Sequence, residues 1–144
     1  ILSSTADQLQ TVAEAYPDQP EASLASLQAG GVLYRDGAFE KALSQYERFL
    51  ANYPSHAMVP HANWGKWMSQ ESLGELEAAL QGYKSLSEED LFYPQALLGQ
   101  ARIMEKQNRT PEAQDIYGRI QEEFPDSNWA EQAQIFSQRA ALGN

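Results

Sequence analysis

The chain has 144 residues, a length that suits one domain with a core of reasonable size. Hydrophobic residues make up 42% and charged residues 21%, which are values of a folded globular protein rather than a disordered one. The formal net charge of −10 makes phosphate backbones and anionic lipids poor partners, so we expect no nucleic acid and no direct membrane contact by this segment. The absence of cysteine excludes disulfides, thiolate catalysis and zinc–cysteine sites.

The first residues carry no targeting signal that can be read. The chain opens with Ile1-Leu2-Ser3-Ser4, without an initiator Met or a charged-then-apolar leader. We therefore expect a processed or shortened form, with any anchor or signal encoded before Ile1. No stretch of the sequence approaches the roughly 20 apolar residues that a membrane helix needs.

Residues 4–15 are the first expected helix. Ala6, Leu9, Val12 and Ala13 recur on one helical face, as in the second helix of a preceding half-repeat. Helical hairpins are then expected three times, each as a helix, a short turn and a second helix. They occupy residues 22–54, 60–86 and 94–125 of what we expect to be a single domain, residues 1–144.

The repeat is visible in the spacing of two residue types. A small residue is followed four positions later by a tyrosine, and both recur at intervals of 37 and 34 residues. The small residues let two helix backbones approach closely. The repeated positions are Ala42, Ala79 and Ala113, with Tyr46, Tyr83 and Tyr117.

Turn and stop signals separate the expected helices. Gly37, Gly74 and Asn108 fall where a helix C-terminus favours a residue that tolerates positive φ. Tyr16-Pro17, Tyr53-Pro54 and Phe124-Pro125 each close a helical run, because proline disfavours helix in the residue before it. The second repeat lacks such a pair at the matching place, and its Tyr93-Pro94 comes about three residues late. We therefore expect a longer loop through Ser87-Glu88-Glu89-Asp90.

Residues 128–141 are expected to form a closing helix, with Trp129, Ala133, Phe136 and Ala140 on one face. Asn128 and Glu131 are the expected capping pair at its start. Stacked repeats need end helices of this kind, because an exposed apolar face would otherwise meet water.

These landmarks resemble the tetratricopeptide repeat family. The order small residue, Gly, Tyr or Phe, Ala, Tyr, Pro over about 34 residues is the signature of that family. The resemblance covers roughly residues 22–142. The second repeat departs most, with Trp67 where a small residue is usual and Lys66 where Leu is usual. The first repeat matches best, through Gly30, Leu33, Gly37, Phe39, Ala42, Tyr46, Leu50 and Pro54.

The resemblance implies an all-α fold. It would be a right-handed superhelix of antiparallel helix pairs, an α-solenoid of about three repeats with an N-terminal helix and a C-terminal capping helix. The segments Tyr46–Pro54 and Ile120–Ser127 are similar to bacterial cell-envelope members, which include accessory proteins of the secretion translocon, of β-barrel assembly and of the Tol–Pal system. A periplasmic or membrane-anchored location facing the periplasm is therefore implied, with a cytoplasmic location as the alternative.

The first helix of each pair lines the concave face in this family, so the resemblance also implies a partner site. An apolar hollow with basic residues near its edge would suit an amphipathic helix or an extended apolar peptide. Aromatic and Met residues at helical spacing are also common in cores, and the closing helix could fill the hollow instead. The expected partner-binding residues are Leu27, Tyr34, Arg35, His61, Trp64, Met68, Leu98, Arg102 and Glu105.

Enzymatic chemistry is not expected. The two histidines, His56 and His61, lie five positions apart rather than on one helical face, which argues against a metal site. No phosphate loop, serine elbow or zincin motif occurs, and paired acids such as Glu122-Glu123 fit a solvated surface. The family's clamp for a peptide carboxylate is incomplete, with Gln28 and Gly65 where Asn would stand. No cofactor and no catalytic residue are predicted.

The prediction is thus a non-enzymatic scaffold that binds a partner protein or peptide, itself a monomer or a weak homo-oligomer, in envelope assembly or secretion. One alternative is a self-assembling module whose groove takes a helix from a neighbouring copy. Another is a small-molecule carrier that uses the hollow beside Trp64 and Met68.

Overall fold

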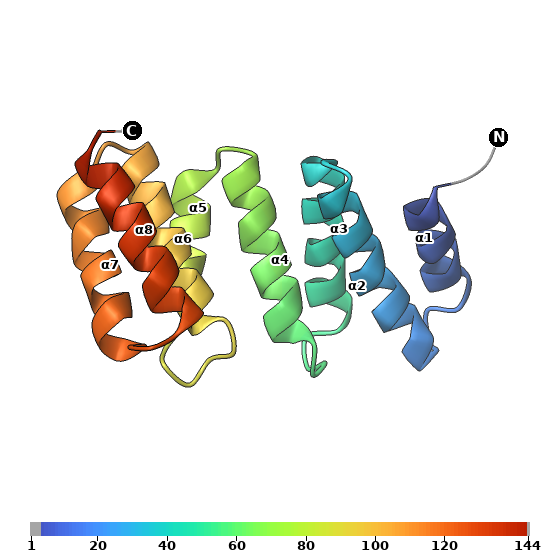
Figure 1. Ribbon diagram of the computed structural model, residues 1–144. Coiled ribbons are helices and arrows are strands. Elements are labelled where there is room, and N and C mark those ends of the chain that lie inside the picture. The colour runs from blue at the N-terminus through green and yellow to red at the C-terminus, as the bar shows by residue number, and fades with distance from the viewer. Residues whose placement is uncertain (1–3, 144) are drawn as a thin grey trace. The chain divides into compact units, whose positions relative to one another are not determined.

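The protein is described by a computed structural model that covers residues 4–143, in which eight α-helices alternate with short connections (Figure 1). These residues contain no strand, so the predicted all-α fold is confirmed. The helices are α1 (Thr5–Ala15), α2 (Pro20–Arg35), α3 (Phe39–Asn52), α4 (Val59–Ser72), α5 (Leu76–Lys84), α6 (Tyr93–Lys106), α7 (Thr110–Glu123) and α8 (Asn128–Ala141).

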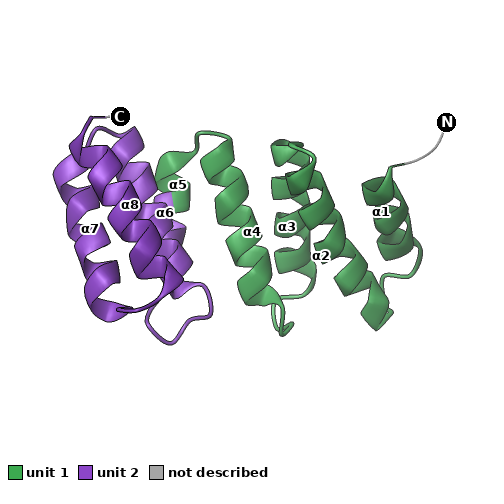
Figure 2. Ribbon diagram, viewed as in Figure 1, with its two compact units in different colours: residues 1–79 green, residues 80–144 purple. Residues whose placement is uncertain are grey.

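The chain is divided into two compact units, residues 1–79 and residues 80–144 (Figure 2). In the first unit α1 packs on α2, α2 on α3 and α3 on α4, while α2 also touches α4. In the second unit α6 packs on α7 and α7 on α8, while α6 also touches α8. In the first unit α3 thus packs on both α2 and α4, which also contact each other. In the second unit α7 packs in the same way on α6 and α8.

Left-handed residues make the tight turns between paired helices. Gly37, Gly74 and Asn108 have φ of 80°, 81° and 59°, which confirms the positive φ predicted for these positions. After α2, the N–H of Ala38 donates to the carbonyl of Leu33 at 2.9 Å, so the turn also satisfies a carbonyl that the helix end leaves open. The same bond pattern recurs after α4 and α6.

An aromatic residue before proline ends three of the helices. Tyr16, Tyr53 and Phe124 are the C-caps of α1, α3 and α7, and the N–H of each still donates to the carbonyl four residues earlier. The following proline disfavours helical geometry at these residues, as predicted. No aromatic–proline pair ends α5. The connection from α5 to α6 occupies residues 85–92, whereas the connection from α3 to α4 occupies only residues 53–58. The longer loop predicted here is confirmed.

The start of α8 differs from the prediction. Asn128 is its first helical residue, and the N-cap is Ser127, whose Oγ accepts a hydrogen bond from the N–H of Ala130 at 3.1 Å. The predicted pair of Asn128 and Glu131 was wrong because Asp126 turns the chain with φ 62° and leaves Ser127 extended. An extended serine places its hydroxyl over the first free N–H groups of the helix.

The repeated alanines and tyrosines lie in the core. They sit on the second helix of each pair, where a side chain of minimal size lets the first helix approach and the ring four residues later fills the space beyond it. The exposed fractions are 0% for Ala42, Ala79 and Ala113, and 7%, 0% and 1% for Tyr46, Tyr83 and Tyr117.

Candidate functional site

In the first unit, the predicted partner-binding residues Leu27 and Tyr34 lie on a stripe along α2. Leu24, Leu27, Gly31 and Tyr34 follow one another at spacings of three and four, so they share one helical face. Leu24 is 46% exposed, Leu27 and Tyr34 are half-buried, and Gly31 is exposed. Arg35 ends the stripe and is exposed. The stripe is thus apolar and accessible over most of its length.

A second stripe runs along α4, at the matching positions of the next repeat. His61, Trp64 and Met68 are half-buried, and Ser72 at its end is exposed. The hydroxyls of Tyr34 and Ser72 lie 3.3 Å apart and share a hydrogen bond, which holds the ends of the two stripes together. Six of the nine predicted residues therefore lie on two adjacent helices of one unit. We call this surface the α2–α4 face.

The back of the α2–α4 face is fixed by one ring. Tyr46 of α3 packs against Gly30 of α2 and Gly65 of α4, where an added Cβ would lie 2.8 Å and 2.3 Å from ring carbons. Burial raises the pKa of the Tyr46 hydroxyl above its ordinary value. Because the ring occupies the place of both side chains, the spacing of α2 and α4 depends on the two glycines.

The other three predicted residues lie on α6 of the second unit. Leu98 is only 5% exposed, whereas Arg102 and Glu105 are half-buried. A carboxylate oxygen of Glu105 accepts a hydrogen bond from the hydroxyl of Tyr117 at 2.8 Å. Burial, followed by this bond, raises the pKa of Tyr117. Glu105 thus has a structural contact within its own unit.

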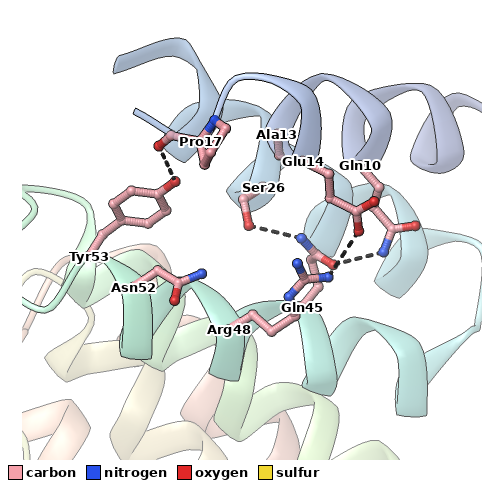
Figure 3. A pocket seen from close by; sticks show the side chains of 9 residues that line it. All are labelled: Gln10, Ala13, Glu14, Pro17, Ser26, Gln45, Arg48, Asn52 and Tyr53. Atoms are coloured by element: carbon pink, nitrogen blue, oxygen red, sulfur yellow. Dashed lines mark hydrogen bonds and ion pairs between the residues drawn. The ribbon is translucent and has the colours of Figure 1, made fainter. Parts of the chain in front are cut away.

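Sequence reasoning did not identify a polar groove between α1 and α3 (Figure 3). At its floor the amide of Gln45 accepts from Nε2 of Gln10 at 2.8 Å and donates to Oγ of Ser26 at 2.8 Å. We call it the α1–α3 groove. Its lining consists of Gln10, Ala13, Glu14, Pro17, Ser26, Gln45, Arg48, Asn52 and Tyr53.

An ion pair and a hydrogen bond connect the two walls of the α1–α3 groove. Arg48 of α3 reaches Glu14 of α1 at 3.3 Å, and the hydroxyl of Tyr53 donates to the carbonyl of Pro17 at 3.4 Å (Figure 3). The side chains of Arg48 and Glu14 are 50% and 60% exposed, so their ion pair adds little to stability. The cavity that remains has a volume of about 210 Å³.

One signal in the sequence could have revealed this network. Gln45 lies three residues after Ala42 and four before Phe49, which puts an amide on the buried face of α3. Its side chain is 3% exposed. A buried amide needs partners, but the sequence does not say that these come from two other helices.

His56 makes structural contacts within the first unit. The N–H of Met58 donates to Nδ1 of His56 at 3.0 Å, and Nε2 of His56 lies 3.1 Å from Oγ of Ser23. Since Ser23 donates its own proton to the carbonyl of Pro20, His56 carries its proton on Nε2. Residues 4–143 contain no group of three or more His, Cys, Asp or Glu side chains that could hold a metal ion.

Comparison with known proteins places this arrangement in a family. The model of the YfiO family, described as outer membrane lipoprotein, matches residues 2–142. The chain belongs to the YfiO family. The predicted resemblance to bacterial envelope proteins of the tetratricopeptide type is thereby confirmed. Within residues 4–143 of this YfiO-family chain, no helix combines the length and the apolar character needed to cross a membrane.

Solved structures show the same tetratricopeptide-like fold. A tetratricopeptide repeat protein from Parabacteroides merdae is 20% identical, with a TM-score of 0.71 over 90% of this chain and 49% of its own. The YfiO-family chain therefore spans about half the length of that protein. A putative kinesin light chain with TPR-like repeats from Podosopora anserina is 12% identical, with a TM-score of 0.75 over 95% of this chain and 76% of its own. A search of curated proteins found no match.

Proposed function

We propose that the chain is a non-enzymatic scaffold that binds a partner protein along the α2–α4 face, on the periplasmic side of a bacterial envelope. The observation that carries the proposal is the pair of accessible apolar stripes, held in register by the hydrogen bond between Tyr34 and Ser72. Membership of a family of outer membrane lipoproteins supports the location. The tetratricopeptide-like fold supports the role, because stacked repeats of this kind offer extended binding surfaces.

The chemistry of the face suggests the form of the partner. Leu27, Trp64 and Met68 offer large, half-buried apolar groups, and Gly31 leaves an open position beside them. Apolar anchors from an amphipathic helix or an extended segment would pack at this open position. Arg35, exposed at one end, would meet a polar or acidic group at the edge of the partner.

Gly31 allows a clean test. An added Cβ would meet only the Tyr46 hydroxyl, at 4.0 Å, so Gly31→Lys places a long charged side chain on the face without disturbing the fold. Gly118 on α7 is the matched control, because an added Cβ there has no neighbour within 4 Å. Partners captured by photo-crosslinking from envelope extracts should be lost with Gly31→Lys and retained with Gly118→Lys. Retention by both variants would show that the partner binds elsewhere.

Two other occupants remain outcomes of the same experiment. If the captured species is a second copy of this chain, sedimentation will show an oligomer that dissociates on dilution and that Gly31→Lys abolishes. If mass spectrometry of the purified protein instead finds a small apolar ligand displaced by Gly31→Lys, the chain is a carrier. Either result would replace the scaffold proposal.

A further inference from the structure

The α1–α3 groove has a counterpart in the second unit. Two steps of 37 residues lead from Gln10 and Glu14 to Lys84 and Glu88, and steps of 37 and 34 residues lead from Arg48 to Arg119. These three residues line a groove between the end of α5 and α7, which we call the α5–α7 groove. Its floor includes Leu97, at the position of Ser26. The same place in the repeat thus forms a groove twice.

The two grooves differ in how their arginines pair. Arg48 reaches across its groove to Glu14, and the opposite walls are tied together. Arg119 turns along its own helix instead, with its guanidinium 3.1 Å from Glu123 and 2.8 Å from the hydroxyl of Tyr93. Within the part of the chain that the structure describes, no salt bridge crosses the α5–α7 groove. Its cavity measures about 670 Å³, against about 210 Å³ for the α1–α3 groove.

A hydrogen-bonded turn at residues 87–90 carries two acidic residues at the edge of the α5–α7 groove. The N–H of Asp90 donates to the carbonyl of Ser87 at 2.9 Å, and both N–H and Oγ of Ser87 bind the Asp90 carboxylate. Glu88 and Glu89 occupy the two central positions of this turn and are exposed. The negative charge of Glu88 contributes to the raised pKa of Tyr93, whose main cause is burial. Among the described residues, Glu88 and Glu89 form no salt bridge.

The α5–α7 groove adjoins a second hollow. A second hollow of about 320 Å³ shares Glu88 with it and continues to Phe124 and Glu123. Leu97 is 1% exposed, and the ring of Tyr93 packs against that of Phe124 with centroids 6.0 Å apart. Buried apolar and aromatic groups therefore lie beneath two adjoining hollows, and Glu88 stands at their shared edge.

We infer that the α5–α7 groove is a second docking surface, which takes an extended segment of a partner protein with a Lys or Arg next to an apolar side chain. The apolar side chain packs against the half-buried Leu86, and the basic group pairs with the exposed Glu88 and Glu89. Anionic ligands are disfavoured, because the charges of Glu88 and Glu89 would repel them.

A peptide selection tests this surface. Random peptides of about twelve residues, displayed on phage, are selected on the intact chain, and the enriched peptides are resynthesised with a fluorescent label. We expect enrichment of Lys or Arg next to Leu, Ile, Phe or Met. Binding of these peptides should weaken at least about tenfold in the variant Glu88→Lys/Glu89→Lys, and should also weaken from about 50 mM to about 500 mM salt.

Two controls separate this surface from the α2–α4 face. Asp18→Lys/Glu47→Lys changes the net charge by the same amount at exposed positions of the first unit and should leave binding unchanged. Gly31→Lys should also leave it unchanged, and its loss of the captured partner tests the proposed function separately. The inference is overturned if no peptide is enriched, if enriched peptides lack basic residues, or if they bind the Glu88→Lys/Glu89→Lys variant as well as the original chain.

Discussion

The ring of Tyr46 occupies the space that a side chain at Gly65 would need. A Cβ at Gly65 would lie 2.3 Å from Cζ of the ring, closer than real Cβ contacts come. The next repeat shows the same relationship, with a Cβ at Gly99 lying 2.6 Å from a ring carbon of Tyr83. The tyrosine of one helix pair and the glycine of the following first helix therefore form a recurring contact between repeats.

The first prediction concerns this contact. Gly65→Ala should destabilise the first unit by about 2 kcal/mol, because the overpacking cost exceeds the gain in helix propensity. Gly31→Ala on α2 should instead stabilise it by about 0.5–1 kcal/mol, because the added methyl group has room. Urea unfolding followed by circular dichroism measures both changes. Equal effects of the two substitutions would contradict the role assigned to the Tyr46 ring.

The second prediction concerns the amide of Gln45. Gln45→Leu removes the bonds to Gln10 and Ser26 and leaves buried polar atoms without partners, so it should cost about 1–3 kcal/mol. In the double variant Ser26→Ala/Gln45→Leu the added cost should be smaller than the sum of the single costs, because both partners of one bond are then apolar. Additive costs, measured by urea unfolding, would show that Gln45 contributes by packing alone.

The third prediction is an alkaline limit to stability. The pKa of Tyr117 is raised by burial and by the bond to Glu105, so the hydroxyl is more acidic in the unfolded chain than in the folded one. Its contribution is complete below about pH 10, the value for an unfolded tyrosine, and is lost as the pH rises through the folded value. Tyr117→Phe should therefore flatten the pH dependence of the second unit's unfolding free energy above that point.

The matched control for this prediction is Tyr16→Phe, because Tyr16 is 63% exposed. The control should keep the alkaline loss of stability. At neutral pH, Tyr117→Phe itself should cost about 1 kcal/mol through the lost hydrogen bond. An unchanged alkaline profile in the Tyr117 variant, measured by urea unfolding at a series of pH values, would assign the limit to other groups.

The fourth prediction concerns the start of α8. Ser127→Ala should cost about 1 kcal/mol, because the N–H of Ala130 loses its acceptor. Asn128→Ala should change stability by no more than about 0.5 kcal/mol, since Asn128 is the first helical residue and not the cap. Amide hydrogen exchange in the first turn of α8 should rise only in the serine variant. A larger effect at Asn128 would restore the capping pair predicted from the sequence.

Most turns and helix ends of this chain could be predicted from the sequence alone. Positive φ at Gly37, Gly74 and Asn108 follows from residue type and position, because few other residues adopt this conformation at low cost. The helix stops at Tyr53 and Phe124 follow from the proline after each, because its ring acts on the preceding residue. Both causes act within a few residues, so they can be read without knowing the fold.

Tertiary structure decided how side chains from different helices meet. The sequence marks Gly65 as a departure from the family pattern, but only the packing of α3 on α4 shows that the Tyr46 ring fills its place. It predicts Glu105 as a partner-binding residue, yet the hydroxyl of Tyr117 donates a hydrogen bond to it within the second unit. Arg48 and Arg119 occupy equivalent positions in the repeat. Arg48 pairs with Glu14 on the other side of its groove, whereas Arg119 pairs with Glu123 on its own helix. Such contacts join residues far apart in the sequence, and spacing alone does not specify them.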